Sequence, residues 1–361
     1  MQQRTNDDRS AGRRTALLAL LVACIVGLTA PSAVARVRPL VNGDFPDPSI
    51  AQTKGKHYVV VGTGEQVLRM SSTNGKRWRL ASPALLTRPA WARPKGAIWA
   101  SDIVRLRGRW VLYFAAPVRG MAPSSRCIGV AIAAHPTGTF RAQGAAPLVC
   151  PPDADVPRAA DPMLDPGQTE PNPPTHGAID PSLFQSPSGS WLLYKTDGRP
   201  SSIRIVPLTP NGLQVAGGSR AILISSGVIE NPVMLHRGRY YYLFMSVGDY
   251  TTCGYRTVYL RSTTPFSWRG ASHSILTKPK THLCGPGGAD VLVEGRGKKA
   301  TVSLYFHAWV CRGSGRPCRE PFHAWAGRED YRRPVRALYG VKLAFTQRKF
   351  PVLGSWIQRS R

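Results

Sequence analysis

The sequence contains the stretch Asp47-Pro48-Ser49-Ile50 and, much later in the chain, its near copy Asp180-Pro181-Ser182-Leu183. Each copy is followed by a glycine-containing turn and by a run of aliphatic and aromatic residues, 58–61 after the first and 191–194 after the second. A short apolar run, a turn and a second apolar run predict a β-hairpin. Each of the two hairpins therefore carries a carboxylate at its entrance.

The same pattern can be followed along the chain in five units. Each unit has an acidic residue near the start of its first predicted strand: Asp47, Asp102, Asp180, Glu230 and Asp290. Repeats of several short strands at this period are typical of propeller blades. We therefore predict an all-β fold, a single five-bladed β-propeller over residues 36–361. The innermost strands of such a fold surround a central axis, so acids at their starts should meet at one end of it.

The first 35 residues predict a secretory signal peptide. A basic segment ending at Arg13-Arg14 precedes an apolar stretch, 16–30, and the small residues Ala33-Val34-Ala35, which is the order expected of a cleaved leader. A retained membrane anchor is less favoured because the apolar run is shorter than the roughly 20 residues of a spanning helix. Lipid attachment at Cys24 is a second, less favoured alternative. We expect a secreted extracellular monomer, with association with the cell wall left open.

Six of the seven cysteines follow the predicted leader. An even number in an exported chain favours disulfides over free thiols. Among the pairings that six cysteines allow, we expect the three that join neighbours in sequence: Cys127 with Cys150, Cys253 with Cys284, and Cys311 with Cys318. No Cys-x-x-Cys spacing is present, so a cysteine-based zinc site is not expected.

The chain carries a net charge of +28 at pH 7, which should attract anionic polymers. The basic residues are scattered and no nucleic-acid-binding motif accompanies them. We therefore expect neither a nucleic acid partner nor an integral membrane partner, and interpret the charge as adaptation to an anionic wall or pectin-like surroundings.

Asp47, Asp180 and Glu230 are the candidate catalytic residues. Hydrolysis of a glycosidic bond needs a carboxylate that activates water and a carboxylic acid that protonates the leaving oxygen. A third carboxylate nearby makes the donor keep its proton through like-charge proximity. A base and an acid separated by roughly 6.5–9.5 Å leave room for the water and predict inversion of configuration.

These residues lie in segments that resemble glycoside hydrolase family 43, the secreted five-bladed propellers that act on arabinose- and xylose-containing polysaccharides. Residues 44–49, Asp-Phe-Pro-Asp-Pro-Ser, resemble the first-blade motif of the general base, which implies that role for Asp47. Residues 179–181, Ile-Asp-Pro, are similar to the motif whose aspartate tunes and orients the acid, here Asp180. Residues 229–232, Ile-Glu-Asn-Pro, resemble the Glu-Gly-Pro motif of the general acid, which implies Glu230, with Asn231 in place of glycine.

Two further segments resemble the family with substitutions. Residues 99–102, Trp-Ala-Ser-Asp, are similar to a Trp-Ala-Pro-Asp segment, with Ser101 in place of proline. Residues 284–288, Cys-Gly-Pro-Gly-Gly, resemble a segment that often reads Gly-Pro-Gly-His, in which the histidine faces a central metal or water. Because Gly288 has no side chain, we expect no metal and no cofactor. His307 could compensate only if it reaches the axis.

Four residues are candidate substrate contacts: Phe45, Trp99, Ile179 and His307. Phe45 and Trp99 could pack against the sugar, as aromatic faces do against apolar surfaces, although an ordinary place in the core is the alternative for both. For Asp102 and Asp290 we favour structural hydrogen bonding over catalysis. The proline-rich acidic insertion, residues 151–177, is expected either to shape the rim of the site or to be a surface excursion.

The resemblance implies a secreted inverting glycosidase acting on arabinan, arabinoxylan or related pentose-containing glycans. An α-L-arabinofuranosidase is the first expectation, with β-xylosidase or endo-arabinanase as alternatives within the family. A non-catalytic carbohydrate-binding propeller is the alternative from another class.

Overall fold

The computed structural model describes residues 37–53, 55–151, 154–156, 177–198, 200–311, 316–317 and 334–358. Residues Arg38–Arg361 form one compact unit. The predicted signal peptide, most of the insertion at 151–177 and Cys318 lie outside the described residues.

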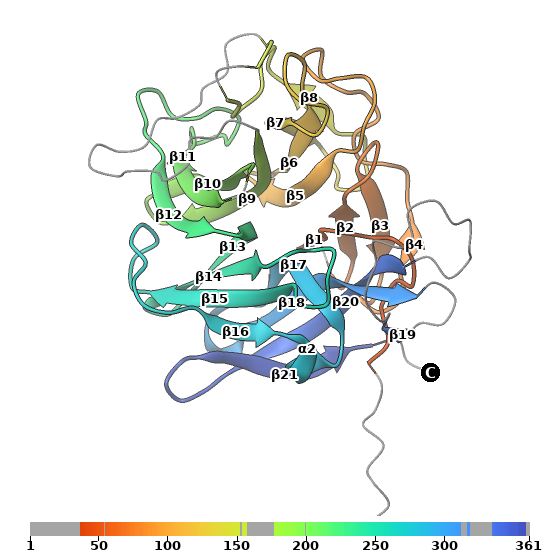
Figure 1. The fold of residues 1–361 in the computed structure, drawn as a ribbon, viewed down its shortest axis with the longest axis vertical. Helices are drawn as coiled ribbons and strands as arrows, with labels where there is room; N and C mark the ends of the chain where they lie inside the picture. Colours follow the sequence, from red (N-terminus) through yellow and green to blue (C-terminus); the bar gives the residue numbers. More distant parts are fainter. Residues whose placement is uncertain are drawn as a thin grey trace, which may run out of the picture. The chain divides into compact units, whose positions relative to one another are not determined.

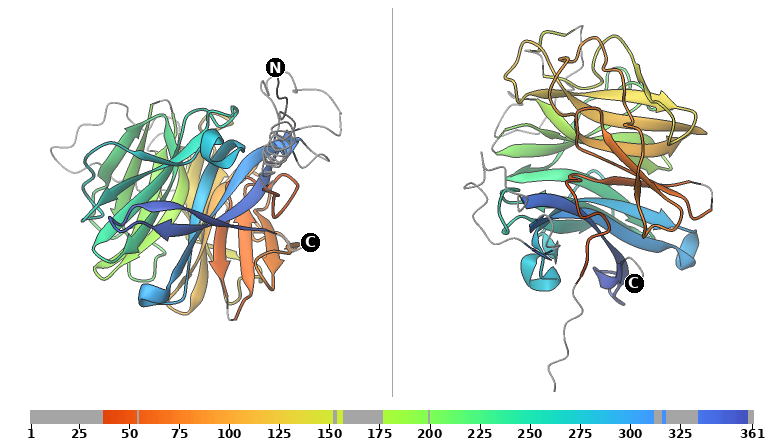
Figure 2. Two further views of the ribbon diagram at one scale, coloured as in Figure 1. Left: turned by 90° about the horizontal axis from the view of Figure 1, so that it is seen from below. Right: turned by 90° about the vertical axis from the view of Figure 1, so that its right-hand side faces the viewer.

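Five antiparallel sheets of this unit surround a common centre as the blades of a propeller (Figures 1 and 2). Blade one contains β1 (Ser49–Gln52), β2 (Tyr58–Gly62), β3 (Leu68–Ser72) and β4 (Arg79–Leu80). Blade two contains β5 (Trp99–Leu106), β6 (Arg109–Pro117), β7 (Arg126–Ala133) and β8 (Arg141–Gln143). Blade three contains β9 (Ala178–Ser186), β10 (Gly189–Thr196), β11 (Ser201–Pro207) and β12 (Ile222–Gly227).

The last two blades follow in chain order. Blade four contains β13 (Ile229–Arg237), β14 (Tyr240–Val247), β15 (Arg256–Ser262) and β16 (His273–Leu276). Blade five contains β17 (Cys284–Glu294), β18 (Thr301–Cys311), β19 (Arg316–Pro317), β20 (Pro334–Phe345) and β21 (Pro351–Ile357). Short helices at α2 (Lys278–Thr281) and η1 (Gly297–Lys299) flank β17. Within the described ranges, no helix is long and apolar enough to cross a membrane.

The ring closes in two ways. The first strand of each blade contacts the first strand of the next blade, and β17 of the last blade contacts β1. The start of the described chain also pairs with β20, because the Leu40 N–H donates to the Leu338 carbonyl at 2.7 Å and the Phe45 N–H to the Arg336 carbonyl at 2.8 Å. The prediction of an all-β, five-bladed propeller is confirmed.

The hydrophobic core lies between neighbouring blades, so the second strand of each blade is covered on both faces. In β6, for example, every residue after Arg109 is buried, and such strands show continuous apolar runs instead of alternation. Aromatic pairs contribute to these layers: Trp91 stacks on Phe114 with centroids 6.2 Å apart, and Phe184 meets Tyr241 of the next blade at 5.9 Å.

One residue near the start of each inner strand adopts a left-handed backbone conformation. These residues are Asp47, Ala100, Asp180, Asn231 and Gly288, with φ between 39° and 59°. In blades two to five the pairing register with the second strand shifts at this point. Positive φ is uncommon for residues other than glycine and is concentrated at functional sites. Five equivalent kinks therefore surround the axis.

The kinks correct the register assumed from the sequence. Asp47 and Asp180 occupy equivalent positions, but the equivalent residue of blade four is Asn231, and Glu230 precedes it by one residue. Asp102 and Asp290 follow the kinks of their own blades by two residues. Asparagine tolerates positive φ better than other non-glycine residues, which explains how Asn231 can stand where the resemblance led us to expect glycine.

Two of the three expected disulfides are present. Cys127 bonds to Cys150 and Cys253 bonds to Cys284. The second bond links the segment after β14 to the start of β17, and so joins blade four to blade five. The third expected pair includes Cys318, which lies outside the described residues.

Candidate active site

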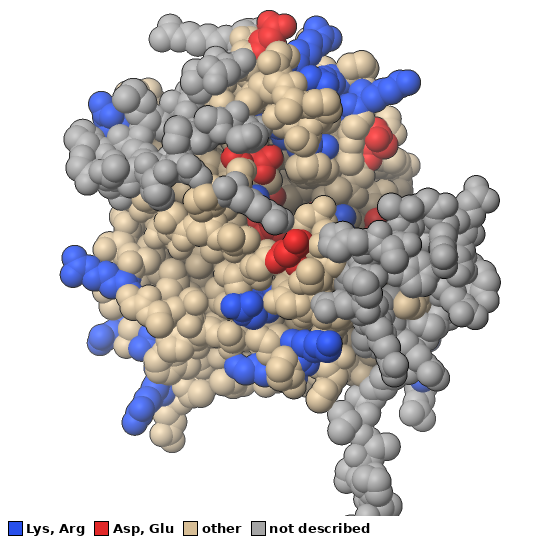
Figure 3. Space-filling view, in the orientation of Figure 1, with Lys and Arg blue, Asp and Glu red and all other residues tan. Residues whose placement is uncertain are grey.

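A pocket of about 630 Å³ opens where the inner strands begin. Asp47, Asp180 and Glu230, from blades one, three and four, all line it. Acidic side chains gather near the centre of this face in Figure 3. The structure therefore brings the three candidate catalytic carboxylates into one pocket.

Asp47 is held from three sides. The Thr63 hydroxyl donates to its Oδ2 at 2.8 Å, and Nη1 of Arg336 lies 3.7 Å from the same oxygen. The Asp47 backbone N–H donates to Nδ1 of His307 at 3.1 Å. A hydroxyl donor and a guanidinium group therefore both face the carboxyl group of Asp47. Its side chain remains 16% exposed, so the pocket can reach it.

Asp180 is buried, and its Oδ2 accepts a hydrogen bond from the Asn231 N–H at 2.9 Å. Burial raises the pKa of Asp180 to about 7; the ammonium group of Lys195 opposes this rise and the carboxyl group of Glu230 adds to it. Asp180 therefore exchanges a proton near neutral pH, and its charge state acts directly on Glu230.

Glu230 contacts a different donor on each carboxyl oxygen. The Tyr255 hydroxyl lies 2.6 Å from Oε1, and Nζ of Lys195 lies 3.4 Å from Oε2. The same hydroxyl is 2.9 Å from Oδ1 of Asn231, and its single hydrogen can serve one acceptor at a time. Burial raises the pKa of Tyr255 well above its usual value, so this residue remains a donor. The Glu230 side chain is 23% exposed.

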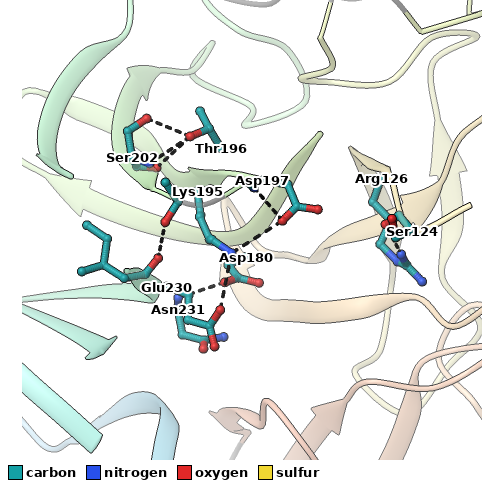
Figure 4. A network of polar contacts seen from close by, with 12 residues as sticks. Ser124, Arg126, Asp180, Lys195, Thr196, Asp197, Ser202, Glu230 and Asn231 are labelled. Atoms are coloured by element: carbon teal, nitrogen blue, oxygen red, sulfur yellow. Dashed lines mark hydrogen bonds and ion pairs between the residues drawn. The ribbon is translucent and has the colours of Figure 1, made fainter. Parts of the chain in front are cut away.

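Lys195 of β10 extends toward the carboxyl groups of Asp180, Asp197 and Glu230 (Figure 4). Besides the contact with Glu230, its Nζ is 3.7 Å from Oδ1 of Asp197, and only 9% of its side chain is exposed. Burial by itself would lower the pKa of this lysine, but Glu230, Asp180 and Asp197 outweigh burial and raise it. Lys195 therefore supplies a fixed positive charge beside the Glu230–Asp180 pair.

His307 lies behind Asp47 and is fully buried. Burial lowers the pKa of His307 to about 3, so the imidazole is neutral. Because Nδ1 accepts from the Asp47 N–H, Nε2 carries the proton; Nε2 has no hydrogen-bond partner in the described part of the chain. The ring runs parallel to that of Tyr255, with centroids 6.0 Å apart. His307 and Tyr255 thus form a packed connection between Asp47 and Glu230.

The missing side chain at Gly288 leaves the space that His307 occupies. A Cβ atom at Gly288 would lie 2.6 Å from both Cε1 and Nδ1 of His307, and 3.1 Å from Oδ1 of Asp47. His307 therefore packs against Gly288 behind Asp47, and it is not among the residues that line the pocket. His307 does not fit a metal ligand, because Nδ1 accepts the Asp47 N–H and the remaining nitrogen, Nε2, carries the proton. Among the described residues, no group of three or more His, Cys, Asp or Glu side chains could hold a metal ion.

Asp102 and Asp290 link neighbouring blades. Asp102 accepts from the Ser49 hydroxyl at 2.9 Å and from the Leu183 N–H at 2.7 Å, and Asp290 accepts from the Ile50 N–H at 2.8 Å. Burial raises the pKa of Asp102 to about 7 and that of Asp290 to about 6. The structural hydrogen bonding favoured from the sequence is therefore observed for both.

Of the other predicted substrate contacts, Trp99 and Ile179 line the pocket and Phe45 does not. Trp99 lines the pocket and is half-buried, with the Arg126 guanidinium 3.1 Å from the centroid of its ring. Ile179 also lines the pocket, although it is buried. Phe45 does not line the pocket and lies in the core between blades one and five. Its ring fills the space above Gly62, where a Cβ atom would lie 3.1 Å from it, so Phe45 has an ordinary place in the core.

Several residues that contact the three carboxylates were not predicted: Thr63, Lys195, Tyr255 and Arg336. Thr63 and Lys195 occupy the same place in their blades, opposite the residue that precedes the kink. Ser246 and His307 hold this place in blades four and five. A polar residue at the end of the apolar run of a second strand is therefore the signal that could have found Thr63 and Lys195. Tyr255 and Arg336 lie outside the second strands and carry no such signal.

Comparison with known proteins identifies relatives that act on arabinose polymers. The chain is 29% identical over 245 residues to a protein of Thermotoga petrophila named extracellular endo-α-(1→5)-L-arabinanase, a match that covers 61% of this chain and 49% of that protein. It is 28% identical over 221 residues to a Cellvibrio japonicus protein named extracellular exo-α-(1→5)-L-arabinofuranosidase, covering 57% and 59%. The chain spans about half the length of the curated relatives it matches.

Solved structures share the fold. A thermostable family-43 glycoside hydrolase superposes with a TM-score of 0.65 at 17% identity, covering 90% of this chain and 98% of that one. The Cellvibrio cellulosa α-L-arabinanase complexed with arabinohexaose gives 0.62 at 19% identity, covering 86% and 95%. The model of the glycosyl hydrolases family 43 matches residues 37–322. The chain therefore belongs to glycosyl hydrolases family 43.

Proposed function

We propose that this protein is a secreted, inverting glycoside hydrolase that cleaves α-L-arabinofuranosyl linkages in arabinan, arabinoxylan or related glycans. The observation that carries the proposal is the convergence of Asp47, Asp180 and Glu230 on one pocket. Membership of the family supports the reaction class. The printed names of the two relatives support arabinose-containing substrates and an extracellular location.

In this proposal Asp47 is the general base and Glu230 the general acid. The Asp47 carboxylate takes a proton from a water molecule as the water oxygen attacks the anomeric carbon. Glu230 gives its proton to the glycosidic oxygen as the bond to the anomeric carbon breaks. Attack on the face opposite the leaving group inverts the configuration. The contacts of Asp47 with Thr63 and Arg336 support this assignment, because they hold its carboxyl group in the pocket.

Asp180 and Lys195 have opposite effects on proton loss from Glu230. An ionised Asp180 makes loss of that proton costlier, whereas the ammonium group of Lys195 stabilises the carboxylate that remains after proton transfer. Tyr255 holds Glu230 in place through the hydroxyl contact at 2.6 Å. The donor can thus give up its proton and regain it within one catalytic cycle.

A second candidate is internal cleavage of arabinan, which is favoured by the relative named endo-arabinanase. The two activities differ in their first products, because an exo-acting enzyme releases arabinose and an endo-acting enzyme releases oligosaccharides. Product analysis also distinguishes both from a β-xylosidase, which would release xylose, and from a carbohydrate-binding propeller, which would release nothing.

The test is to incubate the purified protein with linear arabinan, arabinoxylan, an aryl α-L-arabinofuranoside and an aryl β-D-xyloside, and to analyse the products by chromatography. We expect arabinose release that Asp47→Ala abolishes. Asp44→Ala is a matched control, since Asp44 is exposed and, among the described residues, its side chain accepts one hydrogen bond, from the Arg336 backbone N–H. Activity confined to the xyloside, or arabinan binding without any product, would contradict the proposal. Secretion is tested separately by N-terminal sequencing of protein from the medium, expected to begin near residue 36.

A further inference from the structure

A second, basic groove lies at the other end of β13 from the pocket. Glu230 is at the start of this strand and Arg237 ends it, so at about 3.3 Å per residue the two lie roughly 20 Å apart. The groove runs between blades four and five and has a volume of about 990 Å³. This volume is at the upper end of the range of about 300–1,000 Å³ that ligand sites occupy. The groove is therefore large enough for an extended ligand.

The described residues that line the groove include five cations: Arg237, Arg239, Arg296, Arg348 and Lys349. No Asp or Glu is found among these described lining residues. Glu294 lies between two lining residues in the sequence, but it is not part of the lining and accepts a hydrogen bond from the Tyr58 hydroxyl at 2.6 Å. In the part of the chain that the structure describes, none of the five cations forms an ion pair with a carboxylate. Concentrated charge of one sign attracts counter-ions and charged ligands.

Contacts between the two blades fix the shape of the groove. The Tyr242 hydroxyl donates to the carbonyl of Lys349 at 2.6 Å, and Arg261 donates to the carbonyl of Arg348 at 2.6 Å. Both bonds hold the backbone of the turn between β20 and β21, while the side chains of Arg348 and Lys349 stay exposed. The cations therefore stand on a backbone that is held in place before any ligand binds.

The aromatic rings of the groove orient guanidinium groups. Arg237 lies over the ring of Phe345 at 4.7 Å, and Arg239 and Arg261 lie over Tyr240 at 5.0 and 4.5 Å. Rings covered in this way offer little free face for stacked nucleic acid bases. Oriented guanidinium groups instead match carboxylates, which they bind through two parallel hydrogen bonds.

We propose that this groove binds an acidic polysaccharide built of uronic acid residues. Successive carboxylates of such a chain would pair with the arginines of blades four and five. The site would hold the protein on a carboxylated glycan while leaving the pocket at the other end of β13 free.

The test measures the affinity of the full mature chain for polygalacturonate by calorimetry near physiological salt. The groove variant is Arg239→Ala with Arg348→Ala. The matched control is Arg105→Ala with Arg109→Ala, because these exposed residues flank the β5–β6 hairpin of blade two, the counterpart of the β13–β14 hairpin, and line no part of the groove. Loss of two exposed ion pairs should weaken binding about tenfold in the groove variant, whereas the control should bind like the wild type.

Three results would overturn the proposal. Equal weakening in both variants would show attraction by overall charge alone. Duplex DNA that binds as tightly and depends on the same arginines would show a general polyanion site. An Arg239→Lys, Arg348→Lys variant that binds as tightly as the wild type would contradict recognition of carboxylates by guanidinium groups. Thermal melting and hydrolysis of an aryl arabinofuranoside check that each variant is folded, since the groove lies outside the catalytic pocket.

Discussion

Replacing Lys195 with methionine should move the alkaline limb of the pH–activity profile to higher pH. Methionine keeps an unbranched apolar stem of similar length but removes the charge 3.4 Å from Oε2 of Glu230. Lys195 lowers the pKa of Asp180, so without this cation the pair of neighbouring carboxyl groups, Asp180 and Glu230, holds its proton more tightly. The protonated, donating form then persists to higher pH.

The size of the shift follows from the distance. Two unit charges 3.4 Å apart attract each other by about 5 kcal/mol at an effective dielectric constant of about 20, and about 1.4 kcal/mol corresponds to one pH unit. Without screening, loss of this attraction would thus move the alkaline limb by more than three pH units. Solvent reaches the Glu230 side chain, which is 23% exposed, and screening of a partly exposed pair reduces the effect, so we expect a shift of about one to two units.

The assay is kcat/KM on an aryl α-L-arabinofuranoside across the pH range, because this parameter reports the ionisation of the free enzyme. Lys195→Arg is the matched control, since it keeps the charge and should leave the limb near its wild-type position. An alkaline limb that stays in place while activity falls in Lys195→Met would refute the electrostatic argument and leave Lys195 a packing role.

Three other predictions concern stability. Burial raises the pKa of Asp102 to about 7 and that of Asp290 to about 6, from 3.8. The stability that these two groups add to the folded protein is therefore fully present below about pH 4 and is lost as the pH rises toward 7. The melting temperature should fall as the pH rises through this window, and a rise there would contradict the assignment. Gly288→Ala should lower the free energy of unfolding by about 1–3 kcal/mol, because the added Cβ lies 2.6 Å from the His307 imidazole and because the backbone of residue 288 has positive φ. Denaturant titration measures this change, and a variant as stable as the wild type would show that the site can relax. Replacing Cys253 and Cys284 with serine removes a disulfide between residues 31 apart in sequence. The free energy of unfolding should fall by about 2–4 kcal/mol in the same titration, and no change would mean that the bond does not constrain the unfolded chain.

The blades could be predicted from the sequence because their signals are local. An apolar run, a turn and a second apolar run recur in every unit, as in the stretch from Asp47 to Val61 and the stretch from Asp180 to Tyr194. The period of the repeat then indicated the closed ring. The two disulfides within the described residues followed from short separations in sequence.

The register of the acids could not be predicted, because it depends on backbone conformation. Asp47 and Asp180 adopt positive φ, and so does Asn231, whereas Glu230 does not. Positive φ costs energy at a non-glycine residue and is imposed by the surrounding fold, so residue type alone does not mark it. The acids of blades two and five were aligned with Asp47 for the same reason, although they lie two residues beyond their kinks.

Most residues that support the acids come from the second strand of a blade, whereas the predicted acids lie at the first strand. Thr63 follows β2, Lys195 and Ser246 lie one residue before the ends of β10 and β14, and His307 lies within β18. A polar side chain in such a mostly apolar strand is expensive unless it is paired. Three of these four residues contact the proposed catalytic residues: Thr63 and His307 hold Asp47, and Lys195 holds Glu230. Arg336 comes from the last blade and carries no such local signal.

We propose that Asp47 is the base and Glu230 the acid of one pocket. The most direct measurement compares the rates of Glu230→Ala and Asp47→Ala on two aryl arabinofuranosides, one with a dinitrophenyl leaving group that needs no protonation and one with an unactivated phenyl group. Glu230→Ala should keep most of its activity on the dinitrophenyl substrate and lose about 10²–10⁴-fold on the phenyl substrate, whereas Asp47→Ala should lose activity on both. Equal losses on the two substrates in Glu230→Ala, or substantial hydrolysis of either by Asp47→Ala, would contradict the account.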